Sequence, residues 1–290
     1  MSIKVHLDAA LHPSDTFESP QATDPLHADA AFGSHAEGAE PKASILEQFI
    51  GAPLLEWAPG GVSPYPLIHV HAGQELIHQG TPARSIYLVQ SGDFKQVHIA
   101  EDGYEHVLDF MGRGDVLGFD GLAGGLHAQG AVALADAWVY ALALSSLREL
   151  WQRTPSFATR LHSALAHQLA RSGEIAWMMA AVGADRRTAR FMLHWARRMA
   201  QRGQSERRLR LRMSRRDIAS HLGLAHESIS RSLSMLVEAG LLRVDNREIE
   251  IVDAAGLRRF ALCTRGSMDG VAARLSARHG LPRPPLPEAA

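Results

Sequence analysis

The spacing of hydrophobic positions changes twice along the chain. From about residue 68 to residue 144, short apolar or alternating stretches are separated by glycine-containing turns, which is typical of an antiparallel barrel or jelly roll. From Pro155 to about Val182, apolar residues recur mainly every four positions, which predicts one long helix. From about residue 184 to residue 262, shorter helices precede and follow two short strands. The pattern predicts an α+β chain with a β-roll, a long helix and a C-terminal helical domain.

The two ends of the chain lack such periodicity. Residues 1–43 are rich in Ala, Asp, His and Pro and hold few large apolar side chains, which predicts a disordered N-terminal extension. Residues 263–290 end in LPRPPLPEAA and are expected to be mobile. Between them we expect a jelly-roll-like domain at 44–154 that opens with a short helix, a long helix at 155–182, and a third domain at 183–262.

The long predicted helix carries an apolar stripe that needs a partner surface. One candidate partner surface is a second copy of the same helix. Alternatively, the stripe packs against the β-roll of its own chain. Gly183 follows the helix and is the expected hinge. The residues predicted at the dimer interface are Leu161, Leu165, Leu169, Ile175 and Met179.

The stretch Met213–Leu242 predicts two short helices joined by a tight turn. Ser214 is the expected N-cap of the first helix, which ends at Gly223. The second helix is predicted from about His226 to Glu238 and is followed by Gly240. Its expected inward residues are Ile229, Leu233, Leu236 and Val237. This arrangement is a helix-turn-helix, which presents its second helix to the major groove of DNA.

The outer face of the second helix offers base-reading chemistry at Glu227, Ser230 and Arg231. An arginine donates two hydrogen bonds to guanine and a glutamate accepts from the amine of cytosine, each good pair contributing about 1–3 kcal/mol of discrimination. Alternatively, Glu227 and Arg231 form only an exposed ion pair worth a few tenths of a kcal/mol. Expected phosphate contacts, near the helix starts, are Ser214, Arg215, Arg216, His226 and Ser228.

The flanking segments extend this domain. Leu241–Val252 predicts two short strands around a turn at Asp245 and Asn246, which makes the domain a winged helix. An amphipathic helix is expected from Ala184 to Ala200, a polar linker at 201–212 and a last helix at Ala254–Leu262. The arginines expected to point largely outward from the amphipathic helix are Arg186, Arg187, Arg197 and Arg198.

Charge is distributed unevenly along the chain. The net charge is −1, yet residues 184–262 hold 17 Lys or Arg against 9 Asp or Glu, and residues 1–183 hold 9 against 20. A basic domain suits a partner rich in phosphates, and its binding should weaken with salt. Cys263 is the only cysteine, which excludes an intrachain disulfide and favours the cytosol. We expect neither a membrane span nor a secretory signal, because long apolar runs are absent from the sequence.

The run from Glu227 to Arg231, Glu-Ser-Ile-Ser-Arg, and the triplet Gly118-Phe119-Asp120 are typical of one protein family. On these residues the chain resembles the Crp/Fnr family of dimeric bacterial transcription regulators, and specifically its Fnr-like branch. The resemblance implies that the reader residues recognise a palindrome with TTGAT-like half-sites in double-stranded DNA. It also implies a homodimer with the long helix as its axis, RNA polymerase as a partner, no catalytic residues and no enzymatic activity.

This chain lacks the residues that bind the effectors known from the family. The Fnr archetype holds an iron–sulfur cluster with four cysteines, and this chain has only Cys263. The cyclic-AMP-binding branch has a glutamate where Phe119 stands and an arginine downstream, but Leu122 to Leu134 contains no arginine. We therefore expect no cofactor, no cluster and no cyclic nucleotide. A regulator controlled by its own abundance is a further alternative.

His69, His71 and Glu75 follow the spacing H-x-H-x-x-x-E, which resembles the first metal motif of cupins. Residues two apart on a strand share a face, so the two imidazoles suit a first-row metal. A second cupin motif is missing, since His98, His106 and His127 are candidates only by residue type. Surface histidines without a metal are therefore the preferred interpretation. The alternative is a cupin-like metal- or haem-binding sensor or enzyme fused to a DNA-binding module.

Overall fold

A computed structural model describes residues 44–53, 64–181 and 183–262. The predicted disordered extension at 1–43 and the predicted mobile tail at 263–290 therefore lie outside the described residues. Among the described residues, no helix is both long enough and apolar enough to cross a bilayer.

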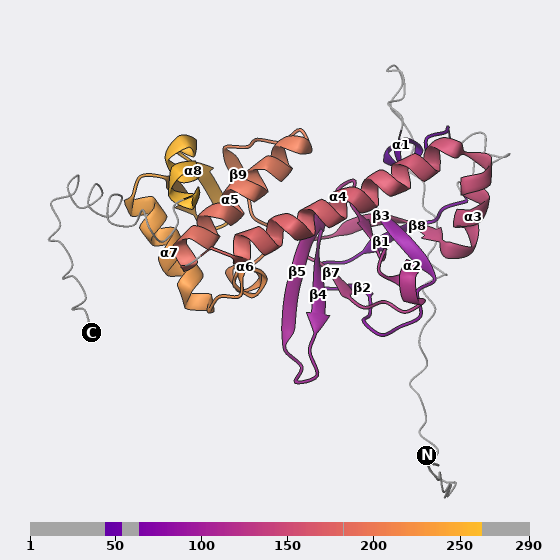
Figure 1. Ribbon diagram of the computed structural model, residues 1–290, viewed down its shortest axis with the longest axis horizontal. Helices are drawn as coiled ribbons and strands as arrows, with labels where there is room; N and C mark the ends of the chain where they lie inside the picture. Colours follow the sequence, from indigo (N-terminus) through magenta and orange to yellow (C-terminus); the bar gives the residue numbers. More distant parts are fainter. Residues whose placement is uncertain (1–43, 54–63, 182, 263–290) are drawn as a thin grey trace, which may run out of the picture. The chain divides into compact units, whose positions relative to one another are not determined.

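Two antiparallel four-stranded sheets build the β-roll (Figure 1). The first sheet has the order β1-β8-β3-β6, with β1 at Leu67–Val70, β8 at Ala137–Ala143, β3 at Ser85–Ser91 and β6 at Val116–Leu117. The second has the order β2-β7-β4-β5, with β2 at Glu75–Ile77, β7 at Gly130–Ala133, β4 at Asp93–Ile99 and β5 at Glu105–Gly112. The jelly-roll-like architecture agrees with the expectation from the sequence.

Side chains from both sheets form one buried cluster. Val89, Phe94, Met111 and Val139 are buried within it, and they come from strands of the two different sheets. Burial alternates along the start of β3 and β4, as expected for strands with one face toward the core. This core holds the strand ends, and hence the surface loops, in fixed positions.

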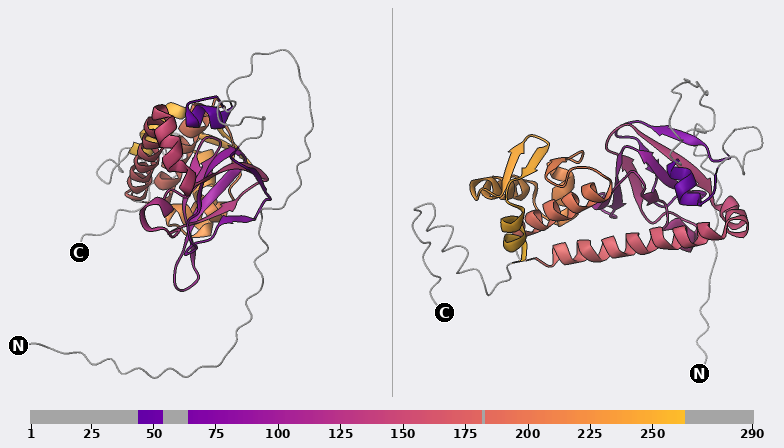
Figure 2. Two further views of the ribbon diagram at one scale, coloured as in Figure 1. Left: turned by 90° about the vertical axis from the view of Figure 1, so that its right-hand side faces the viewer. Right: turned by 90° about the horizontal axis from the view of Figure 1, so that it is seen from above.

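Four helices accompany the roll: α1 at Ile45–Ile50, α2 at Gly121–Gly124, α3 at Leu144–Arg153 and α4 at Pro155–Met179. Ser44 and Glu47 form a capping box that starts α1. Helix α4 has 25 residues, and Figures 1 and 2 show it as one continuous helix. Its first turns bury Phe157 and Leu161 in a cluster with Leu46 and Ile50 of α1. The start of α4 is therefore part of the core of its own chain.

The C-terminal domain contains four helices and a three-stranded sheet (Figure 2). The helices are α5 at Ala184–Gln201, α6 at Arg215–Leu222, α7 at His226–Glu238 and α8 at Ala254–Leu262. The sheet has the order β10-β11-β9, with β10 at Leu242–Asp245, β11 at Glu248–Ile251 and β9 at Arg208–Arg210. Strand β9 lies within the segment that the sequence predicted to be a linker. That part of the interpretation was wrong.

Helix α5 departs from the expected orientation of its arginines. Phe191 and Trp195 are buried. Arg186 and Arg198 are also buried, although the sequence placed them outward, and Arg197 is exposed. The helix therefore contributes fewer solvent-facing charges than its sequence indicates.

Candidate nucleic-acid interface

Helix α6 begins with a capping box. The Ser214 hydroxyl accepts from the Asp217 amide at 3.1 Å, and both the Ser214 amide and hydroxyl donate to Asp217 Oδ2, at 2.8 and 2.6 Å. These bonds satisfy backbone groups that a helix start leaves unpaired. They also occupy the two donors of Ser214. The structure therefore corrects the assignment of Ser214 to a phosphate, because its donors serve the helix start.

The turn between α6 and α7 depends on Gly223. This residue has φ of 59°, in the left-handed region that favours glycine. The Arg187 guanidinium donates to the carbonyl of Leu222 at 3.1 Å, and thus caps the end of α6. Ser232 of α7 donates to Asp185 of α5 at 2.6 Å. The two motif helices are therefore anchored to the domain on their inner sides.

Helix α7 separates an apolar face from a polar face. Ile229, Leu233 and Leu236 are buried, whereas Glu227 and Arg231 are exposed. Because these two are four residues apart, they share one side of the helix. Val237 was expected to point inward but is 40% exposed. The polar face of α7 is nevertheless free along the turn that carries the reader candidates.

The structure links a reader candidate to a phosphate candidate. Arg215, at the start of α6, donates to the hydroxyl of Ser230 in α7 at 3.2 Å. Ser230 is half-buried, while Arg216 and His226 are exposed and Ser228 is half-buried. Apart from Ser214, the candidates thus lie at the starts of the two motif helices and on the exposed side of α7. This is one surface that offers cationic and hydrogen-bonding groups.

The opposite side of α6 contacts strand β5 of the roll. Ser220 Oγ donates to the carbonyl of Glu105 at 3.1 Å and accepts from the amide of Val107 at 3.0 Å. His221 Nδ1 lies 3.2 Å from the carbonyl of Val107, and its ring lies against Phe110 and Phe191. Burial lowers the pKa of His221 to about 4.

A partly buried ion pair adds to this contact. Lys95 Nζ of β4 lies 3.1 Å from Asp217 Oδ1 of α6. Burial alone would raise the pKa of Asp217, but the hydrogen bonds from Ser214 and the charge of Lys95 lower it overall. Asp217 therefore both caps α6 and ties it to the roll. In the sequence, the only signal for the capping role of Asp217 is its position three residues after Ser214.

The five predicted dimer-interface residues of α4 differ in how far they are buried by their own chain. Leu161 is 5% exposed and belongs to the core of its own chain, so the structure corrects its assignment to a dimer interface. Leu165 and Ile175 are half-buried against the same chain, and the Met179 side chain lies beside Gly223. Leu169 is 76% exposed. Of the five predicted residues, Leu169 has by far the most surface available to a partner.

The roll residues that were considered for binding a nucleotide or a metal lie in different surroundings. Phe119 is buried in the cluster that includes Leu88 and Leu142, so an apolar ring fills its position. Glu75 does not join His69 and His71; it pairs with His78 Nδ1 at 2.8 Å. The chain turns at Gly73, which has φ of 82°, and carries Glu75 into the other sheet. The structure therefore corrects the H-x-H-x-x-x-E ligand set.

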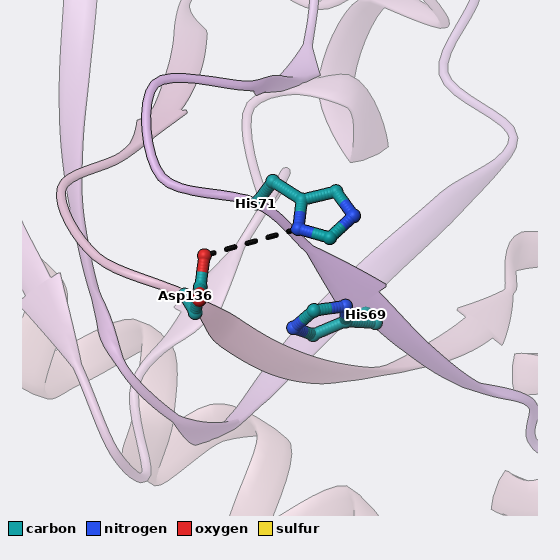
Figure 3. Close-up of side chains that lie close together, drawn as sticks. All are labelled: His69, His71 and Asp136. Carbon is teal, nitrogen blue, oxygen red and sulfur yellow. Dashed lines mark ion pairs between the residues drawn. The ribbon is translucent and has the colours of Figure 1, made fainter.

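A different carboxylate approaches the two histidines. His69, His71 and Asp136 each place a possible metal ligand atom so that all three lie within 4.8 Å of one another (Figure 3). Sequence reasoning missed Asp136 because it is more than sixty residues from His71 in the chain. Only the pairing of β1 with β8 brings it close.

Comparisons with known proteins agree with this architecture. Residues 67–154 match the family described as cyclic nucleotide-binding domain, and residues 186–260 match the Crp-like helix-turn-helix domain. The fumarate and nitrate reduction regulatory protein of Salmonella typhimurium is 32% identical over 196 residues, which cover 68% of this chain and 78% of that protein. Electron transport regulator A of Shewanella oneidensis is 32% identical over 192 residues, covering 66% and 77%.

Solved structures give the same result. The structure of FixK2 from Bradyrhizobium japonicum superposes with a TM-score of 0.62 at 27% identity, covering 69% of this chain and 98% of that one. The two matched families cover the roll and the helix-turn-helix in the order found here. The chain belongs to the Crp/Fnr family of transcription regulators and carries its DNA-binding helix-turn-helix.

Proposed function

We propose that this regulator binds, as a homodimer, a DNA palindrome with TTGAT-like half-sites, and that Glu227, Ser230 and Arg231 read its bases. The observation that supports the proposal is the division of α7: its apolar residues are buried, and Glu227 and Arg231 are exposed on one side near its N-terminus. In a helix-turn-helix, this end of the second helix contacts base edges.

The chemistry of the two charged readers is complementary to a G·C pair. Arg231 can donate to O6 and N7 of guanine, while Glu227 accepts from N4 of cytosine. A TTGAT half-site contains one such pair. Ser230 is held by Arg215 at 3.2 Å, which restricts the hydroxyl to the same surface. We therefore assign base reading to this turn of α7.

Phosphate contacts are proposed for Arg215, Arg216, His226 and Ser228. Arg215 and Arg216 occupy the first two positions of α6, and His226 and Ser228 lie in the first turn of α7. Helix starts carry partial positive charge and favour phosphate oxygens. These contacts orient the domain on the duplex without selecting a sequence.

The dimer is proposed to form along the exposed side of α4. This side presents Leu169 together with the small exposed residues Ala166, Ala170, Gly173 and Ala176. Small side chains allow two helices to approach closely, and Leu169 supplies apolar area. Replacing Leu169 by Glu should produce monomers in sedimentation experiments, whereas Leu126→Glu, at another exposed leucine, should leave the dimer intact. A dimeric Leu169→Glu variant would remove this face from the proposal.

We further propose that the chain uses neither a four-cysteine cluster nor a cyclic nucleotide. One cysteine cannot supply four thiolates, and buried Phe119 offers a nucleotide no hydrogen bond. A regulator of this kind acts in the cytosol and acts on RNA polymerase at promoters. The sequence supports the cytosol through its cysteine usage.

The test is a binding measurement on the full chain, purified in air with nothing added. Fluorescence anisotropy at fixed physiological salt compares a TTGAT-N4-ATCAA duplex with a scrambled duplex of equal length. We expect a preference of at least about 1,000-fold, as is usual for specific sites. Equal affinity for both duplexes by a folded dimer would refute the target assignment.

A further inference from the structure

Two histidines and an aspartate lie together at the edge strand β1 of the roll, on other elements than the candidate DNA-reading helices α6 and α7. We propose that His69, His71 and Asp136 bind one divalent first-row transition metal ion of the Zn²⁺ or Ni²⁺ class. The two imidazoles and the carboxylate present one ligand atom each, and these atoms lie within 4.8 Å of one another (Figure 3).

Strand pairing brings the three residues together. In the antiparallel pair of β1 and β8, His69 lies opposite Trp138 and Val70 lies opposite Ala137. Continued by one residue, this register places His71 across from Asp136. His69 and His71 are two apart and share one face of the strand. The ligand set is therefore a consequence of the sheet and not of a flexible loop alone.

Hydrogen bonds and ring contacts hold the ligands in place. Asp136 Oδ1 accepts from the amide of Ala72 at 2.9 Å, and the amide of His71 donates to Gln74 Oε1 at 3.0 Å. The ring of His69 lies 4.6 Å from that of Trp138 and 4.5 Å from that of His71, centre to centre. Such second contacts orient ligands before an ion arrives.

The possible ligand atoms are close enough to move onto one ion by small side-chain rotations. His71 Nδ1 lies 3.9 Å from Asp136 Oδ1, and ligand atoms bound at about 2.1 Å from one Zn²⁺ are closer to one another than that. The side chains of His71 and Asp136 are 73% and 68% exposed, so small rotations are sufficient. Three protein ligands leave further coordination positions for water.

The ligand types select the class of ion. Imidazole suits Zn²⁺, Ni²⁺ and Cu²⁺, whereas Mg²⁺ and Ca²⁺ prefer sets made only of oxygen atoms. An ion at this position would join the end of β1, an edge strand, to the residue that precedes β8. The proposal does not depend on the DNA target proposed above.

The experiment uses tag-free full chain treated with EDTA and titrated with Zn²⁺ in a calorimeter. His69→Gln with His71→Gln is compared with His98→Gln with His106→Gln, a control pair of histidines that lie opposite each other on β4 and β5. All variants keep the four histidines of residues 1–43, whose contribution therefore cancels. We expect the first pair to lose one binding event, with affinity reduced at least about 100-fold, more than the loss of an outer contact causes.

Ni²⁺ supplies a second, local readout. Its open d shell quenches the fluorescence of an indole at contact distance, and the ring of Trp138 lies 4.6 Å from that of His69, centre to centre. Saturable quenching should disappear in the His69 and His71 double variant and in Trp138→Phe, while Trp138→Phe still binds Zn²⁺. Asp136→Asn keeps an acceptor for Ala72 but loses the anionic ligand, and should weaken binding about 10-fold. Unchanged Zn²⁺ affinity in the His69 and His71 variant, or an equal loss in the control pair, would overturn the proposal.

Discussion

The arginines of the C-terminal domain lie in two different environments. Arg215, Arg216 and Arg231 of α6 and α7 are exposed, whereas Arg198 of α5 is 6% exposed. Arg198 donates to Asp109 Oδ1 at 2.9 Å and to Asp115 Oδ2 at 3.0 Å, both in the roll. The first set is exposed to solvent, whereas Arg198 is neutralised within the chain.

This difference changes how the charge count is interpreted. Arg198 and Arg202 contribute to the basic excess of residues 184–262, and Asp109 and Asp115 to the acidic excess of residues 1–183. Arg171 of α4 pairs with the same two aspartates. Part of the asymmetry is therefore cancelled by internal ion pairs. The number of basic residues in a domain overestimates the field that DNA experiences.

Arg198→Ala should have the largest effect. It would leave Asp109 and Asp115, whose side chains are only 11% and 12% exposed, with fewer cations, and we expect the free energy of unfolding in urea to fall by about 3 kcal/mol. Arg197→Ala is the control, because Arg197 is the preceding residue and its side chain is largely exposed and paired to Glu174. This variant should change the free energy of unfolding by less than about 0.5 kcal/mol. Equal losses in the two variants would contradict the distinction between buried and exposed arginines.

The buried side of α6 should respond to acid. The pKa of His221 falls from 6.5 to about 4 on folding, because burial disfavours its charged form. The neutral form therefore stabilises the fold above pH 6.5, and this contribution is lost as the pH falls from 6.5 to about 4.

Over that interval wild type should lose about 3 kcal/mol more unfolding free energy than His221→Phe, which cannot titrate. The nearby Asp109, His106 and His194 are present in both proteins, so the comparison isolates the contribution of His221. Urea denaturation at a series of pH values measures it. Parallel pH profiles of the two proteins would show that His221 does not titrate with a lowered pKa.

On the exposed side, Arg231→Ala should change DNA binding and leave stability unaltered. We expect a loss of about 1–3 kcal/mol at the cognate duplex and weaker discrimination at one guanine. Anisotropy with duplexes substituted at each position measures this, and the urea midpoint serves as the control. A variant that still discriminates at every position would show that Arg231 is not a base reader.

Arg216→Ala should have the smallest effect. It should weaken binding to all sequences alike and lower the slope of log affinity against log salt by about one. Arg215→Ala should combine both effects, because Arg215 also holds the hydroxyl of Ser230. Salt titrations on cognate and scrambled duplexes separate the two. Sequence-dependent losses in Arg216→Ala would assign that residue to base reading instead.

Local signals in the sequence were sufficient for much of the fold. Helix α7 runs from His226 to Glu238 and α8 from Ala254 to Leu262, as their apolar spacing and flanking residues predicted. Ser214 caps α6 and Gly223 ends it, because capping and left-handed turns depend on near neighbours.

Features that depend on distant residues were not predictable in the same way. Strand β9 has three residues and exists through its pairing with β11. Arg198 is buried because aspartates more than eighty residues earlier in the chain receive it. Asp136 likewise replaces Glu75 beside His71 because of a sheet register. In each case the residue is visible in the sequence, but its partner is distant in the chain and is identified only by the fold.

The contact of α6 with β5 has a consequence for solubility. Strand β5 lies at the end of its sheet, so one side of its backbone has no neighbouring strand in that sheet. Ser220 and His221 bond to backbone groups of Glu105 and Val107 on this strand. An open strand edge is a template for pairing with another chain. Any motion that lifts α6 away from the roll must therefore cover this edge in another way, or the released form will be prone to aggregate.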